Sequence, residues 1–260
     1  MRFKLILDIN KQAFGNILPI NYQYEQSAVI YHLLASGSAE YSAWLHDNGF
    51  TVEDKKTFKL FCFSPFKVEK RKQVADRLLV LSNTVEWVIS FLPERSTEEF
   101  IKGVFTNQTF TIGDTKSRVQ MRIRSVEALP EPQYTETMLY STMSPIFIKY
   151  RDESGKDLYL SPDDERSAAI VKTGLIDKYR SFYGDDLDAD NIEVRYDVLD
   201  TPKRKRVVIK SGTSSETSLI GYKCKLKVTA PIQLQRVINN AGLGSLCSQG
   251  FGCMKIIDNK

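Results

Sequence analysis

Residues 242–252 read Gly-Leu-Gly-Ser-Leu-Cys-Ser-Gln-Gly-Phe-Gly, two Gly-apolar-Gly triplets separated by five residues. Glycine has no Cβ, so its backbone enters positive-φ conformations and can lie directly against a ligand. Successive backbone N–H groups in such a turn form a concavity that binds anions. The stretch therefore predicts an anion-binding loop, with a flexible hairpin as the alternative.

The positive charge of the chain gathers around this loop. Residues 201–260 carry eleven lysines and arginines against two acidic residues, a formal charge of +9, whereas the whole chain carries only +4. A basic region beside a glycine-rich loop indicates a polyanionic partner. The alternative is a solvated charged face.

Composition indicates an intracellular globular protein. With 260 residues and 42% hydrophobic content, the chain can bury the core of one large or two small domains. The four cysteines show no CxxC pair and no zinc spacing, and we interpret them as reduced thiols of a cytoplasmic protein. No signal peptide or transmembrane segment is evident, so no membrane partner is expected.

The first half has the pattern of a ferredoxin-like unit. Strands are predicted at about 2–9, 58–64, 85–91 and 118–127, and helices at about 24–36, 39–46 and 95–106. This order, strand–helix–strand–strand–helix–strand, defines the unit. The joint Leu129-Pro130-Glu131-Pro132 separates the halves, and we predict domains over 1–128 and 133–260.

The second half repeats the pattern with insertions, so the predicted fold class is α+β. A helix is expected from Ser161 as N-cap and Pro162 as first residue, and a short helix from Pro231. The predicted strands lie near 137–150, 191–198, 205–210, 218–229 and 251–257. The acidic stretch 184–190 lacks the glycine and final glutamate of an EF-hand, and we interpret it as a solvated loop.

Few residues suit acid–base catalysis. The chain has only two histidines, His32 and His46, and no Ser-His-Asp, zinc or P-loop motif. Tyr31 and His46 lie on two predicted helices joined by a Ser-Gly turn, which can fold back and bring them together. Lys59 is a charge within an otherwise apolar strand, and it faces either solvent or a ligand.

Several blocks resemble the CRISPR repeat RNA-processing endoribonucleases of the repeat-associated protein superfamily. The resemblance spans essentially the whole chain and includes the glycine-rich loop that is typical of the family. The other matching blocks are Asn21–Tyr24 with Tyr31, Tyr41 to His46, Lys59–Ser64, Leu139–Pro145 and Pro202–Arg204.

The resemblance implies two tandem ferredoxin-like domains, related to RNA-recognition folds, and a catalytic triad of Tyr31, His46 and Lys59. It also implies cleavage of CRISPR precursor RNA within each repeat, without metal or other cofactor. The ribose 2′-hydroxyl attacks the adjacent phosphate and leaves a 2′,3′-cyclic phosphate and a 5′-hydroxyl. A histidine is the side chain best suited to exchange these protons near neutral pH.

RNA binding is expected mainly in the second domain, where alternation places Lys223, Lys225 and Lys227 on one face of a strand. We expect the glycine-rich loop to position RNA and the triad of the first domain to cut it. A smaller basic patch comprises Lys67, Lys70, Arg71 and Lys72. The predicted RNA-binding residues are Lys203, Arg204, Lys205, Arg206, Lys210, Lys223, Lys225, Lys227, Gly242, Gly244, Gly250 and Gly252.

Three points stay open at this level. His46 is either base or acid, and Lys55 and Lys56 compete with Lys59 for the cationic role. The alternative functions are a non-catalytic RNA-binding or effector-complex subunit and a protein–protein interaction module. The expected partners are CRISPR repeat RNA and other CRISPR-associated effector subunits, with the protein a monomer or homodimer.

Overall fold

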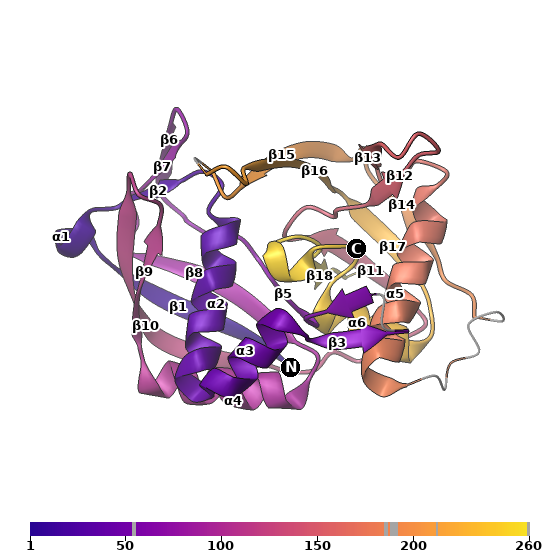
Figure 1. Cartoon of the computed structure of the whole chain (residues 1–260), viewed down its shortest axis with the longest axis horizontal. Coiled ribbons are helices and arrows are strands. Elements are labelled where there is room, and N and C mark those ends of the chain that lie inside the picture. Colours follow the sequence, from indigo (N-terminus) through magenta and orange to yellow (C-terminus); the bar gives the residue numbers. More distant parts are fainter. Residues whose placement is uncertain (54–55, 185–186, 188–191, 212, 259–260) are drawn as a thin grey trace.

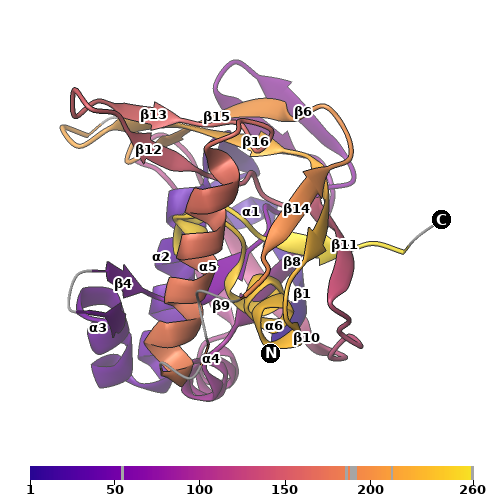
Figure 2. The same cartoon turned by 90° about the vertical axis from the view of Figure 1, so that its right-hand side faces the viewer.

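Each half of the chain forms its own antiparallel sheet with helices packed on one face (Figures 1 and 2). The computed structural model describes all residues except 54–55, 185–186, 188–191, 212 and 259–260. The expected loop over 184–190 therefore lies largely outside the described residues.

The first sheet has the order β5-β8-β1-β10-β9. Helices α2 (Gln23–Gly37) and α4 (Glu94–Thr106) pack against each other beside it. Its strands are β1 (Arg2–Asn10), β5 (Phe61–Phe63), β8 (Thr84–Phe91), β9 (Thr109–Gly113) and β10 (Arg118–Leu129). Alternate residues of β1, Phe3, Leu5 and Leu7, are buried in the core, as the period of a half-buried strand requires.

The second sheet has the order β14-β17-β11-β18, and its helices are α5 (Ser167–Tyr183) and α6 (Ile232–Ala241). Its strands are β11 (Thr137–Thr142), β14 (Arg195–Val198), β17 (Lys225–Thr229) and β18 (Met254–Ile256). With β9 set aside, both sheets place their strands in the order second, third, first, fourth. This shared order confirms the predicted tandem ferredoxin-like fold.

Further short elements decorate these two units. The helical ones are α1 (Lys11–Phe14), α3 (Ala39–Asp47) and the 3₁₀ turn η1 (Cys247–Gln249). A three-stranded sheet consists of β2 (Ile17–Pro19), β7 (Arg77–Val80) and β6 (Arg71–Val74). Three hairpins complete the set: β3 (Phe50–Val52)–β4 (Lys56–Phe58), β12 (Lys149–Arg151)–β13 (Asp157–Tyr159) and β15 (Lys203–Ile209)–β16 (Thr217–Lys223). Figure 1 shows β15–β16 reaching from the second half towards the first.

The helix expected from Ser161 begins later, at Ser167, so that prediction was wrong in its start. The carbonyl oxygen of Ser161 accepts hydrogen bonds from Asp164 N and Ser167 Oγ. The Asp164 carboxylate accepts hydrogen bonds from the main chain and the guanidinium of Arg166. Local hydrogen bonds of serine and aspartate thus form turns in place of the first helical turn.

The two halves are held together by polar and apolar contacts. Arg2 on β1 donates through its guanidinium to the main-chain oxygens of Met254 and Asn239, both in the second half. Cys62 packs with Cys247 and Cys253, and all three thiols are free and buried.

Over the described residues, no helix has the length and apolar character needed to cross a bilayer.

Candidate active site and RNA-binding surface

The structure brings Tyr31 and His46 together, as the turn between their helices predicts. Ser38 caps α3 through its Oγ, which accepts from Tyr41 N, and this cap fixes the reversal between α2 and α3. Ser42 Oγ donates to the main-chain oxygen of Tyr31 and ties the two helices together. The rings of Tyr31 and His46 meet edge to face, with centroids 5.1 Å apart.

Lys59 reaches the same place from a bend in the chain. The predicted strand over 58–64 is interrupted, because Leu60 has a φ of 53° and β5 begins only at Phe61. At this bend the Nζ of Lys59 donates to the main-chain oxygen of His46 over 2.6 Å. Burial lowers the pKa of Lys59, while the nearby Asp47 carboxylate opposes that shift.

Asp47 is a fourth member of this group that the sequence reasoning missed. Its Oδ1 lies 2.8 Å from Nδ1 of His46. Burial raises the pKa of Tyr31 well above its usual range, and the Asp47 charge adds to that shift. The only sequence signal for Asp47 is its position directly after His46 at the end of a helix.

The rival lysines differ in their surroundings. Lys56 forms an ion pair with Asp177 of α5, with Nζ and Oδ2 2.6 Å apart. Lys55 lies outside the described residues. Lys59 is the lysine that contacts the His46 main chain, and this contact supports it over Lys56 for the cationic role.

The four glycines of the loop pack against the protein itself. All four have positive φ, between 63° and 91°. A Cβ on Gly244 would lie 2.8 Å from the main-chain oxygen of Phe147, and one on Gly250 would lie 2.7 Å from Cβ of Gln23. Gly242, Gly250 and Gly252 are buried, so the lack of a side chain at these positions allows neighbouring residues to pack against the loop. The prediction that the loop binds RNA stays a prediction. Between the two triplets Ser245 is exposed, and Ser248 and Gln249 are half-buried.

The loop and Lys59 line one cavity of 350 Å³. Ser27 on α2, one helical turn before Tyr31, donates from Oγ to the main-chain oxygen of Ser248. The loop therefore lies beside Lys59, one of the proposed catalytic residues, although the loop belongs to the second half of the chain and Lys59 to the first. The loop contributes Gly244, Ser245, Leu246, Cys247, Ser248 and Gln249 to this cavity.

The basic residues fall into two groups rather than one track. Lys223 ends β16, whereas Lys225 and Lys227 belong to β17 of the four-stranded sheet, so the predicted single strand over 218–229 is wrong. Burial lowers the pKa of Lys223, and Lys205 and Arg71 add to that shift. Arg71 lies on β6 of the first half, so cations from the two halves face each other here.

The cations of β15 project from the hairpin. Its first four residues, Lys203, Arg204, Lys205 and Arg206, are all exposed. Lys210, at the end of the strand, places its Nζ 6.0 Å from the ring centroid of Tyr24, the second residue of α2. The hairpin thus extends a positive surface from the second half to the helix that carries Tyr31.

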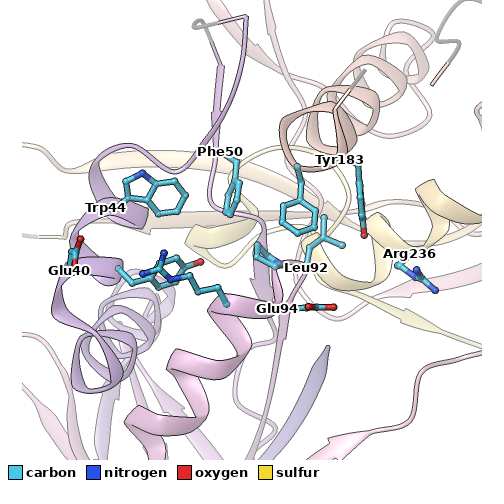
Figure 3. A pocket seen from close by; sticks show the side chains of 11 residues that line it. Glu40, Trp44, Phe50, Leu92, Glu94, Tyr183 and Arg236 are labelled. Carbon is cyan, nitrogen blue, oxygen red and sulfur yellow. The ribbon is translucent and has the colours of Figure 1, made fainter. Parts of the chain in front are cut away.

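A different hollow, a cleft of 610 Å³, lies on another side of α3 (Figure 3). Trp44, Phe50 and Tyr183 contribute aromatic rings to it, with Glu40 at one end and Arg236 at the other. None of Tyr31, His46 and Lys59 is among its lining residues. The cleft is thus separate from the candidate catalytic group.

Family comparisons agree with this architecture. Residues 17–123 match the family model described as CRISPR-associated protein Cas6, N-terminal, and residues 129–256 match that of CRISPR associated protein Cas6, C-terminal. The chain belongs to the Cas6 family. The two Cas6 models meet at the joint between the two sheets.

Individual Cas6 relatives cover the whole chain. The CRISPR-associated endoribonuclease Cas6 of Pyrococcus furiosus is 26% identical over 264 residues, which cover 100% of this chain and 91% of the relative. A solved Cas6-related protein of Pyrococcus furiosus superposes with a TM-score of 0.83 at 20% identity, covering 100% of this chain and 99% of that one. A solved RAMP protein, described as binding different RNA substrates, gives a TM-score of 0.81 at 22% identity, with 99% and 100% covered. These two structures share the fold.

Proposed function

We propose that the protein is a metal-independent endoribonuclease that cuts CRISPR precursor RNA within its repeats. The observation that carries the proposal is the meeting of Tyr31, His46 and Lys59 beside the glycine-rich loop. Family membership supports an endoribonuclease, and the RNA-binding relative supports an RNA substrate. We propose that the RNA backbone binds to the cations of β6 and of β15–β16, which lie near each other.

In the proposed reaction the ribose 2′-oxygen attacks the adjacent phosphorus, and the bond to the 5′-oxygen breaks. The products are a 2′,3′-cyclic phosphate and a 5′-hydroxyl. The 2′-hydroxyl loses a proton and the departing 5′-oxygen gains one, so the reaction needs no oxidant or reductant. An ionised Asp47 only accepts hydrogen bonds, which places a proton on Nδ1 of His46 and makes Nε2 the atom that exchanges protons with RNA.

The other two residues act on the phosphate. The Tyr31 hydroxyl, whose pKa is raised by burial, is protonated near neutral pH like an ordinary tyrosine, and it donates a hydrogen bond to a phosphate oxygen. The Lys59 ammonium, held by the His46 main chain, offsets the negative charge that develops on the phosphate. Burial strengthens this effect because the local dielectric is lower than that of water.

The test is cleavage of cognate repeat RNA in the presence of EDTA by the wild-type protein and by His46→Ala. We expect one cut with a cyclic phosphate end, and a loss of rate of about 10²–10⁴-fold in the variant. His32→Ala is the matched control, since His32 is exposed and its Nε2 contacts Asn107 instead. Salt-dependent RNA binding with no cut under any condition would support the non-catalytic alternative. Cleavage that needs a divalent metal, or an unchanged rate in His46→Ala, would contradict the mechanism.

A further inference from the structure

A buried lysine lies behind the glycine-rich loop. Lys178 is in α5, and the whole residue is only 5% exposed. Its Nζ donates to the main-chain oxygens of Gly242 over 2.7 Å and of Gly244 over 2.9 Å. It also lies 3.2 Å from Sγ of Cys247. One ammonium thus contacts both the first triplet of the loop and the residue that begins η1.

These three contacts account for all the hydrogen-bonding capacity of the side chain. An ammonium has three protons, and the structure supplies two carbonyl oxygens and one sulfur. Burying an ammonium costs free energy unless each proton is paired. The preceding carboxylate, Asp177, binds Lys56. The partners of Lys178 are therefore two main-chain oxygens and one thiol, all three in the loop. The pairing of the ammonium depends on the loop conformation, and the loop conformation depends on the ammonium.

The positive φ values of Gly242 and Gly244, 81° and 83°, accompany this arrangement of the backbone. Two carbonyl oxygens of one loop converge on the same ammonium, and without it they would repel each other and lose a charged partner. On the other side of the loop, Ser245, Ser248 and Gln249 line the cavity that contains Lys59. Lys178 lines this cavity too.

We propose that Lys178 is a positioning residue, whose ammonium holds the glycine-rich loop in the conformation that binds RNA beside Lys59. The expected effect on RNA binding rests on the proposed function. The expected effect on the loop conformation does not. Lys178 acts through the two loop carbonyl oxygens that its ammonium holds.

The test compares Lys178→Met with Lys172→Met, the same substitution six residues earlier on the same helix, at a residue that is only partly buried. The loop is observed directly by NMR of ¹⁵N-glycine-labelled protein, which has 14 glycines. We expect the amide signals of Gly242, Gly244, Gly250 and Gly252 to shift or broaden in Lys178→Met alone, while those of Gly15 and Gly155 stay in place. Unchanged loop signals in a folded Lys178→Met protein would overturn the proposal, whether or not the protein cuts RNA.

RNA affinity and the single-turnover rate provide the second readout. Lys178→Met should weaken RNA binding by about tenfold or more, because two loop carbonyl groups lose their charged partner. Leu175→Ala, in the second core, controls for a general loss of stability. If Leu175→Ala with an equal fall in Tm weakens binding equally, Lys178 has only a structural role and the proposal fails. If Lys178→Met does not fold, Lys178→Gln is measured instead, since its amide keeps a donor for one of the carbonyls, and the same glycine signals decide the outcome.

Discussion

The Nζ of Lys59 donates a hydrogen bond to the main-chain oxygen of His46 over 2.6 Å. The cation is therefore held by the backbone of the very residue that is proposed to exchange protons with RNA. A main-chain oxygen does not titrate, so this contact persists whether the imidazole is charged or neutral. The spacing of the two proposed catalytic residues is thus set by the fold rather than by the charge of the imidazole.

This contact distinguishes the roles of two nearby lysines. We expect Lys59→Met to lower the single-turnover rate by about 10²–10³-fold, since it removes a charge that stabilises the transition state. Lys56→Met should leave the rate within about threefold, but should lower Tm because Asp177, which is largely buried, loses its partner. Single-turnover cleavage and thermal unfolding of both variants check this. A greater loss of rate in Lys56→Met would reassign the cationic role.

The pH dependence of cleavage should report the environment of Lys59. Its pKa is lowered in the folded protein, chiefly by burial. The charged fraction therefore falls at a lower pH than in an ordinary lysine, and the rate should begin to decline on the alkaline side earlier than an unshifted lysine would allow. Lys59→Arg, which stays charged, should extend the plateau of the rate to higher pH. Identical alkaline profiles in the two proteins would show that Lys59 does not set this limb.

Asp47 should affect the proton exchange without contacting RNA. Asp47→Asn removes the charge that opposes the lowering of the Lys59 pKa, so the alkaline decline should shift further towards lower pH. The substitution also weakens the hold on Nδ1 of His46, and we expect a rate loss of about tenfold or more with RNA affinity unchanged. The measurement is the pH–rate profile at saturating RNA. Asp47 is exposed at the helix end, so Tm should hardly move.

The sequence supported the order of core elements better than the local geometry of the site. Both strand–helix–strand–strand–helix–strand units were predicted, because buried apolar residues recur with strand or helix period. The edge strand β9 was missed although its residues alternate between exposed and buried. The sheet β2-β7-β6 was missed in part because exposed, charged strands such as Arg71–Val74 have no such pattern. The later start of α5 was missed because Asp164 N and Ser167 Oγ donate to the main-chain oxygen of Ser161, a local turn that the N-cap pattern does not reveal.

Within the site, the meeting of Tyr31 and His46 could be predicted, because both lie on consecutive helices joined by a short turn. The place of the loop beside Lys59 could not, since it depends on how the two halves pack. Lys178 was missed for the same reason: in the sequence it is one of two lysines on this helix, and its burial depends on tertiary contacts.

The facing cations of the two halves predict a shared contribution to RNA binding. Lys205→Glu and Arg71→Glu should each weaken binding and flatten the dependence of log K on log salt, by about 0.7 per lost phosphate contact for single-stranded RNA. Lys116→Glu, in the exposed turn between β9 and β10, is the control with the same charge change. Binding isotherms over a range of salt concentrations measure the slopes. Equal slopes in all four proteins would show that this surface does not bind RNA.

The close fit between Gly250 and Gln23 has a consequence for how this chain can vary over time. A Cβ at position 250 would lie 2.7 Å from Cβ of Gln23 and 3.2 Å from the ring of Phe63, both from the first half. Residues at positions 23 and 250 should therefore change together among descendants, although 226 residues of chain separate them. Two halves that fit in this way can no longer be recombined freely with the halves of distant relatives.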